Sequence, residues 1–284
     1  MSPLFLDSKR PIIDINLSQI TTLSKQLIGK LSISGVQKKL SLKWDKATNA
    51  LLPAPVGGEY ILKPQLEQWS FVPENENLTM DLADLVGINT ALHTLISLGD
   101  GSNAYLVKRF DRIKSHKLAF EDFAQLLGIY AQDKYSASVE SMGKVIDRFS
   151  AAPGIDKVKF FKLILFNFLV GNTDAHTKNY GLLGYPHGYR LSPAYDLVST
   201  KLIIPEDKDE SALQINGKKN HLKNIDFEVL AHNLNLSSKS VIKVFRDLQK
   251  LKDEGVVLVA ASKLPEDYKT RYEAILSSNW AKIS

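Results

Sequence analysis

The 284-residue chain contains no cysteine, which excludes disulfides, thiolate metal ligands and a cysteine nucleophile. Long apolar runs are also missing. The longest, residues 163–170 (interrupted by Asn167) and 256–261, fall far short of the roughly 18 residues that a membrane-spanning helix needs. The first thirty residues lack the basic start and apolar centre of a signal peptide. These absences predict a cytoplasmic protein in a reducing compartment, with no membrane segment.

A basic tail is absent as well. The formal net charge is +5, but lysine and arginine are spread over the whole chain. Two local basic clusters remain, one of Lys38, Lys39, Lys43 and Lys46, the other of Lys218, Lys219, His221 and Lys223. Such clusters are more often solvated faces than nucleic-acid footprints. For the second we favour a solvated turn over a role in a DNA-bound complex.

The length and the average composition, 44% hydrophobic and 24% charged, predict one large or two small globular units. Apolar–polar alternation over residues 36–44 and 59–63 predicts strands, with a leucine-striped helix over 78–86 and another strand over 104–107. After Arg109 helical patterns dominate, over residues 121–130, 137–149, 157–170, 241–255 and 265–280. We therefore predict a β-rich part of residues 1–108 and an α-helical part of residues 109–284.

A polar run, residues 171–179, follows the most buried of the predicted helices. It must form a loop anchored by a rigid element, which is where catalytic groups are often found. Asp174 and Asn179 have the spacing of the catalytic aspartate and the magnesium-binding asparagine of kinase catalytic loops. Asp196 follows in a strand-like context and could take the second metal-binding role. So many metal-ligand types in one short segment favour a function over simple helix capping.

Upstream, residues 31–39 form a short polar loop that leads into a strand. The loop has a single glycine, so it matches neither the glycine-rich loop of eukaryotic kinases nor the P-loop. Its backbone N–H groups, with Lys38 and Lys39, could still bind phosphates. Lys63, at the end of a predicted strand, is the candidate to reach the α- and β-phosphates, although an isolated lysine there is more often an exposed charge.

Five segments resemble, in order, the successive motifs of HipA-like serine/threonine kinases, the toxins of bacterial toxin–antitoxin modules. They are SGVQKK at 34–39, YILKP at 60–64, KRFDR at 108–112, NTDAHTKN at 172–179 and AYDL at 194–197. The resemblance implies an α+β, two-lobed protein-kinase-like fold related to phosphoinositide kinases, with a small β-rich N-lobe and a larger α-helical C-lobe. The chain would lack the extra N-terminal subdomain of full-length HipA, as in the short HipT form of three-component HipBST systems.

The resemblance also implies residue roles and two cofactors, ATP and Mg²⁺. Asp174 would be the catalytic base, Asn179 and Asp196 would hold Mg²⁺, and Lys63, oriented by Glu76, would contact the ATP phosphates. The other cofactor-binding residues would be Ser34, Gly35, Val36, Gln37, Lys38 and Lys39 over the phosphates, Lys108, Arg109 and Phe110 in the hinge that contacts adenine, and His176, Lys178 and Tyr195 near the nucleotide.

Ser32 aligns with the serine that members of this family autophosphorylate, and Ser34 is a second candidate. A phosphate there adds about −1.5 to −2 charges, which would repel the ATP phosphates and switch the kinase off. The implied substrate is a translation component, an aminoacyl-tRNA synthetase. The implied partners are a small protein that supplies the missing subdomain and a helix-turn-helix antitoxin, with DNA contacted through the complex.

Two other interpretations stay open. A metal-dependent hydrolase could use Asp174, His176 and Asp196, but it would leave Lys63 and the loop at residues 31–39 without a role. A non-catalytic nucleic-acid-binding scaffold would depend on the basic clusters, yet no expected catalytic position is degraded.

Overall fold

The computed structural model describes residues 4, 11, 13, 39–113 and 116–284. The chain divides into two compact units, one of residues 1–77 and 91–112 and the other of residues 78–90 and 113–284. The division predicted at residue 108 stays a prediction. The nucleotide-loop residues Ser32, Ser34, Gly35, Val36, Gln37 and Lys38 lie outside the described residues.

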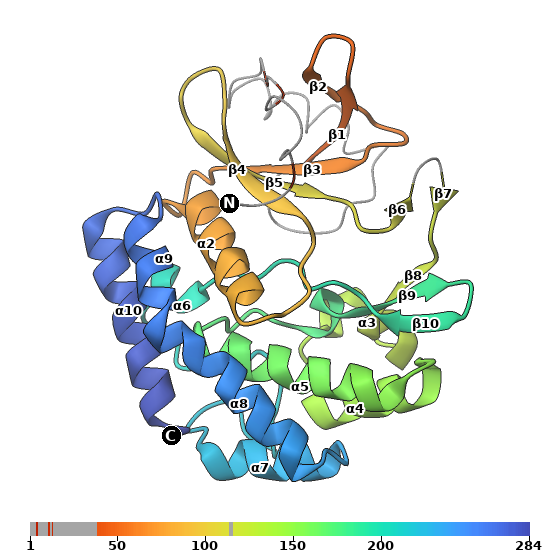
Figure 1. Ribbon diagram of the computed structural model, residues 1–284, viewed down its shortest axis with the longest axis vertical. Helices are drawn as coiled ribbons and strands as arrows, with labels where there is room; N and C mark the ends of the chain where they lie inside the picture. The colour runs from red at the N-terminus through yellow and green to blue at the C-terminus, as the bar shows by residue number, and fades with distance from the viewer. Residues whose placement is uncertain (1–3, 5–10, 12, 14–38, 114–115) are drawn as a thin grey trace. The chain divides into compact units, whose positions relative to one another are not determined.

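The first unit contains a five-stranded antiparallel sheet in the order β2-β1-β3-β5-β4 (Figure 1). Its strands are β1 (Leu40–Asp45), β2 (Ala50–Pro53), β3 (Tyr60–Pro64), β4 (His93–Ser97) and β5 (Asn103–Lys108). In β1, Leu40 and Leu42 are fully buried and Lys43 is exposed, as the predicted alternation requires, but Ser41, expected on the polar face, is buried as well. Leu62 and Leu106 join them in one apolar core on a face of the sheet.

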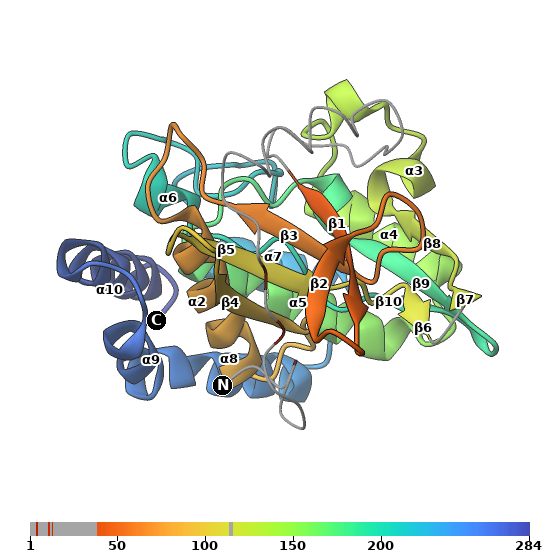
Figure 2. The ribbon, with the colours of Figure 1, turned by 90° about the horizontal axis from the view of Figure 1, so that it is seen from above.

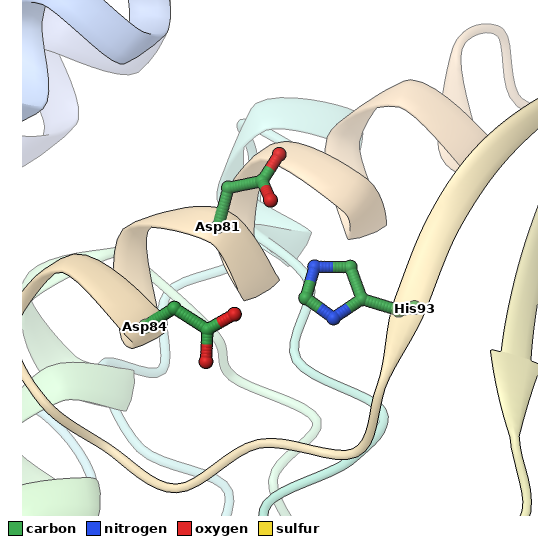
Figure 3. A group of neighbouring side chains, drawn as sticks. All are labelled: Asp81, Asp84 and His93. Atoms are coloured by element: carbon green, nitrogen blue, oxygen red, sulfur yellow. The ribbon is translucent and has the colours of Figure 1, made fainter. Parts of the chain in front are cut away.

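Helix α2 (Val72–Leu85) begins in the first unit and ends in the second. Its later half carries Asp81 and Asp84, one turn apart (Figure 3). The Thr90 hydroxyl donates to Asp84 at 2.5 Å, which ties the end of the helix to the segment that follows. His93, also labelled in Figure 3, belongs to β4 of the first unit, where its ring stacks on Tyr105. We therefore do not assign these three side chains to one site.

The second unit is built around helix α5 (Pro153–Leu169), which is buried on nearly all sides from Phe160 onward. The other helices are α3 (Phe123–Leu127), α4 (Val139–Phe149), α6 (Thr200–Ile203), α7 (Asn224–Asn233), α8 (Ser238–Asp253), α9 (Gly255–Ala261) and α10 (Glu266–Ala281). Helices α4, α8 and α10 contact α5. Figures 1 and 2 show α8, α9 and α10 side by side in this unit. Among the described helices, none has the length and apolar character to cross a membrane.

A second sheet interrupts the helical part. Strands β8 (Phe120–Asp122), β9 (Gly181–Tyr185) and β10 (Gly188–Leu191) form it in the order β10-β9-β8. A shorter pair, β6 (Arg112–Ile113) and β7 (His116–Lys117), precedes it. The predicted helix over residues 121–130 is therefore wrong at both ends. Its first two residues are in β8, and α3 stops at Gly128, which has a left-handed φ of 69°.

Candidate active site

Lys63 in β3 and Glu76 in α2 form a buried ion pair within the first unit. Lys63 Nζ lies 2.5 Å from Glu76 Oε1, and the two residues are only 4% and 3% exposed. The Lys63 ammonium also lies 5.3 Å from the centre of the Tyr105 ring. The pairing expected from the sequence is confirmed, and the alternative that Lys63 is a plain surface charge is wrong. A buried ammonium that pairs with a carboxylate is a pre-oriented cation, which suits phosphate binding.

The predicted hinge, Lys108 to Phe110, follows the same sheet. The backbone N–H of Lys108 donates to Leu92 at 2.7 Å, and that of Arg109 donates to Glu59 at 2.8 Å. The Arg109 guanidinium pairs with Asp111. Burial raises the pKa of Asp111, but Arg109 and Arg112 lower it by more, so that the pKa is below its usual value. Any adenine contact from Lys108 and Arg109 must therefore use groups other than these two N–H donors.

In the second unit, the loop predicted to be catalytic leaves the C-terminal end of α5 at a left-handed glycine. Gly171 has a φ of 69°, and a Cβ there would lie 3.0 Å from Ile275 and 3.1 Å from Lys201. Glycine is needed here because a side chain would strain the left-handed backbone and would also crowd Ile275 and Lys201. Gly171 follows the end of α5 directly, and the chain turns sharply there.

Buried amides form the floor of this loop. Asn172 donates to Asn167 at 2.9 Å, and Asn167 donates to the Tyr180 hydroxyl at 3.0 Å. The Asn172 side-chain oxygen in turn accepts the backbone N–H of Asp174 at 3.2 Å. The side chains of Asn167 in α5 and of Asn172 in the loop therefore hold the loop backbone in place, while Asp174 is exposed at the tip of the loop.

The far end of the loop brings the two predicted metal ligands together. The Asn179 amide nitrogen Nδ2 donates to Asp196 Oδ2 at 3.4 Å, and the Asn179 amide oxygen Oδ1 accepts the backbone N–H of His176 at 3.0 Å. Amide and carboxylate oxygens are the ligands that Mg²⁺ prefers, so these residues fit the cation. The strand-like context predicted for Asp196 is wrong, because the residue has a left-handed φ of 56° outside any strand. This turn directs its carboxylate toward Asn179.

His176, a residue of this loop, is buried. Burial lowers the pKa of His176, although the nearby Asp174 carboxylate opposes the shift. The imidazole is therefore neutral at pH 7, and its Nδ1 has no hydrogen-bond partner within the described part of the chain. A neutral ring does not bind phosphate through charge, and the predicted contact of His176 with the nucleotide stays a prediction.

Lys178 and Tyr195 hold the loop to its neighbours. The Lys178 ammonium pairs at 2.7 Å with Asp122, the residue that caps α3. The Tyr195 hydroxyl donates to the Lys178 carbonyl at 2.8 Å. Their predicted contact with the nucleotide stays a prediction, while their observed contacts brace the loop.

Tyr135, which belongs to none of the sequence motifs, also contacts this loop. It lies between the short 3₁₀ turn η2 (Ala131–Asp133) and α4, and its hydroxyl donates to Asp174 Oδ1. The Lys219 ammonium of the second basic cluster lies 5.8 Å from the centre of the Tyr135 ring, and Lys218 pairs with Asp226. Lys218 nevertheless stays solvent-exposed beside the turn at residues 216–217, which agrees with the interpretation of this cluster as a solvated turn.

The two units together define the class of fold. A five-stranded antiparallel sheet with a buried Lys–Glu pair, and a helical unit that presents an Asp–Asn–Asp set, are typical of the protein-kinase type of fold. The chain belongs to the HipA-like C-terminal domain family, whose model matches residues 31–254.

Curated relatives carry kinase names. The chain is 35% identical over 237 residues to "Putative kinase Y4dM" of Sinorhizobium fredii, covering 77% of this chain and 57% of that protein. It is 32% identical over 196 residues to the serine/threonine-protein kinase toxin HipA of Shewanella oneidensis, covering 61% of this chain and 44% of the toxin. The chain thus spans about half the length of these relatives.

Solved structures confirm the predicted fold. HipA from the Shewanella oneidensis complex of HipA, HipB and operator DNA matches 98% of this chain and 72% of its own, with a TM-score of 0.73 and 22% identity. The Helicobacter pylori proinflammatory kinase CtkA matches 96% of this chain and 93% of its own, with a TM-score of 0.65 and 17% identity.

Proposed function

We propose that the chain is an ATP-dependent serine/threonine protein kinase that acts as the toxin of a type II toxin–antitoxin system. One observation carries the proposal: Asp174 is exposed at the tip of a loop whose other end brings Asn179 within 3.4 Å of Asp196. The kinase names of the curated relatives, one of them a serine/threonine kinase toxin, support it.

The chemistry assigned to these residues is phosphoryl transfer. The hydroxyl oxygen of a serine or threonine attacks the γ-phosphorus of ATP, its proton passes to the Asp174 carboxylate, and the bond to the departing ADP breaks. Asn179 and Asp196 would hold Mg²⁺, which neutralises charge on the phosphates. Lys63, oriented by Glu76, would contact the α- and β-phosphates.

Replacement of the base tests this proposal. The purified chain is incubated with Mg²⁺ and γ-³²P-labelled ATP, and phosphate transferred to protein is counted. Asp174→Asn is expected to lower the rate by about 10²- to 10⁴-fold, the range for a general base. Asp253→Asn is a matched control, because Asp253 is exposed at the end of α8. Equal rates for wild type and Asp174→Asn would refute the proposal, and metal-dependent hydrolysis that persists without ATP would favour a hydrolase.

We further propose that the kinase regulates itself by phosphorylation at Ser32, Ser34 or both. Phosphate in the nucleotide-covering loop would repel the phosphates of ATP. Mass spectrometry of the chain after incubation with Mg-ATP is expected to find phosphate between Leu31 and Lys38. Its absence from that peptide, in protein that phosphorylates other targets, would contradict the proposal.

The proposed substrate is an aminoacyl-tRNA synthetase, and the proposed partners are a helix-turn-helix antitoxin and a small protein that supplies the N-terminal subdomain. The Shewanella oneidensis HipA structure, a complex with HipB and operator DNA, supports an antitoxin partner. Phosphoproteomics after induction of wild type and of Asp174→Asn would identify the substrate. Co-purification with the products of neighbouring genes tests both partners, and a lone chain recovered at native expression levels would contradict them.

A further inference from the structure

The segment that precedes α4 is attached to the catalytic loop at three points. The Thr177 hydroxyl donates to the Lys134 carbonyl at 2.8 Å. The rings of Tyr135 and His176 meet edge to face, with centroids 5.2 Å apart. The Tyr135 hydroxyl donates to Asp174 Oδ1, across 39 residues of sequence. These three contacts hold both the backbone at Lys134 and the ring of Tyr135 against the loop, so that the Tyr135 hydroxyl is fixed beside Asp174.

The carboxylate of Asp174 needs such a partner. Asp174 is exposed at the tip of its loop, where an unrestrained side chain would sample several rotamers. Across residues 39–113 and 116–284, Tyr135 is the one side chain that donates a hydrogen bond to this carboxylate. A donor on Oδ1 fixes the side-chain torsions and leaves Oδ2 for another hydroxyl.

The environment of Tyr135 keeps it a donor. Burial, and then the hydrogen bond to Asp174, raise the pKa of Tyr135 well above its usual range, so the phenol stays protonated at neutral pH. Two ammonium groups lie over its ring, Lys134 Nζ at 4.9 Å and Lys219 Nζ at 5.8 Å from the centroid. Such cation–π contacts hold the ring in place and favour donation by the hydroxyl.

We propose that Tyr135 is a positioning residue for Asp174, which holds Oδ1 so that Oδ2 faces the hydroxyl of the phosphate acceptor. The inference rests on the proposed kinase function and deepens it. In the transfer step the acceptor proton moves to Oδ2 as the new oxygen–phosphorus bond forms and the bond to ADP breaks. Tyr135 keeps its own proton throughout, so it orients the base without touching the reacting atoms.

Removing one oxygen atom tests this role. Tyr135→Phe keeps the ring and its contacts but cannot donate, and Tyr130→Phe is the matched control, because Tyr130 is 73% exposed. The single-turnover rate of autophosphorylation is measured over a range of ATP concentrations. Tyr135→Phe is expected to lower the maximal rate by about 10- to 100-fold, the scale of a misplaced catalytic group, with the half-saturating ATP concentration unchanged. Tyr130→Phe is expected to match wild type.

Each other kinetic outcome counts against the proposal. An equal maximal rate means that Asp174 needs no positioning. A faster rate means that the contact inhibits, and a changed half-saturating ATP concentration at constant rate means that Tyr135 acts in nucleotide binding. An inactive wild-type chain refutes the proposed function and the inference with it, whereas an active wild type with an equally active Tyr135→Phe refutes the inference alone.

A second measurement does not depend on activity. With tyrosine labelled by ¹³C at Cζ, the Tyr135 signal is assigned by its loss in Tyr135→Phe. It is expected not to titrate near pH ~10, where an ordinary tyrosine does, and to titrate at lower pH in Asp174→Asn than in wild type. If the Tyr135 signal titrates identically in Asp174→Asn and in wild type, the hydrogen bond between Tyr135 and Asp174 does not form, and the proposal is overturned.

Discussion

Glu76→Gln is expected to destabilise the first unit strongly, because it removes the carboxylate that pairs with the buried Lys63 ammonium. The pair is 2.5 Å apart, and both residues are at most 4% exposed, so neither charge can turn to solvent. Breaking a buried pair from one side costs about 3 to 5 kcal/mol in the free energy of unfolding. That is a large part of the roughly 5 to 15 kcal/mol by which a domain is stable.

Urea unfolding followed by tryptophan fluorescence measures this loss, since Trp44 and Trp69 belong to the first unit. Glu266→Gln is the matched control. It breaks a Lys269–Glu266 pair of similar length, 2.7 Å, in which the glutamate side chain is 88% exposed. An exposed pair is worth at most about 1 kcal/mol, so this variant is expected to unfold nearly as wild type does.

The double variant Lys63→Met/Glu76→Leu separates charge from packing. It removes both charges and keeps similar volume, so it is expected to be more stable than Glu76→Gln alone, while losing phosphoryl transfer. A cost for Glu76→Gln as small as that for Glu266→Gln would refute the reasoning about burial. A double variant no more stable than the single one would show that packing, not charge, sets the cost.

The sequence predicted elements whose pattern is local. Leu40 and Leu42 alternate with polar residues, and the structure buries both in β1. The apolar run that follows Lys157 predicted a buried helix, which is α5. The Lys63–Glu76 pair was implied by the family resemblance and not by a local pattern, since the helix predicted from the leucine spacing began only at residue 78, whereas α2 begins at Val72.

Tertiary contacts explain what was missed. β9 begins with Gly181, a poor strand former, which is needed because a Cβ there would lie 2.4 Å from the Phe120 ring of β8. The left-handed turn at Asp196 is unusual for a non-glycine residue, and no sequence pattern predicts it. Tyr135 is a loop aromatic, and its proposed role depends on a hydrogen bond to Asp174, 39 residues further on, which no local pattern predicts.

Two further predictions concern the helical unit. Gly171→Ala is expected to lower the free energy of unfolding in urea more than Gly217→Ala does. Both glycines have a left-handed φ, which costs a substituted alanine about 1 to 2 kcal/mol of strain, but of the two only Gly171 has atoms within 4 Å of the new Cβ. Equal losses for the two variants would contradict a steric role of Gly171. Asp156 is fully buried and accepts two hydrogen bonds of 3.0 Å from Arg190. Burial would raise the pKa of Asp156, but the bonds from Arg190, Ser150 and the Leu191 backbone outweigh it and lower the pKa. A carboxyl with a lowered folded-state pKa stabilises fully above its unfolded pKa, and that stability is lost as the pH falls through the folded value. The free energy of unfolding of wild type is therefore expected to fall below about pH 4, and that of Asp156→Asn to start lower and fall less. Urea unfolding between pH 7 and pH 3 measures both, and parallel pH curves for the two proteins would show that Asp156 does not titrate with folding.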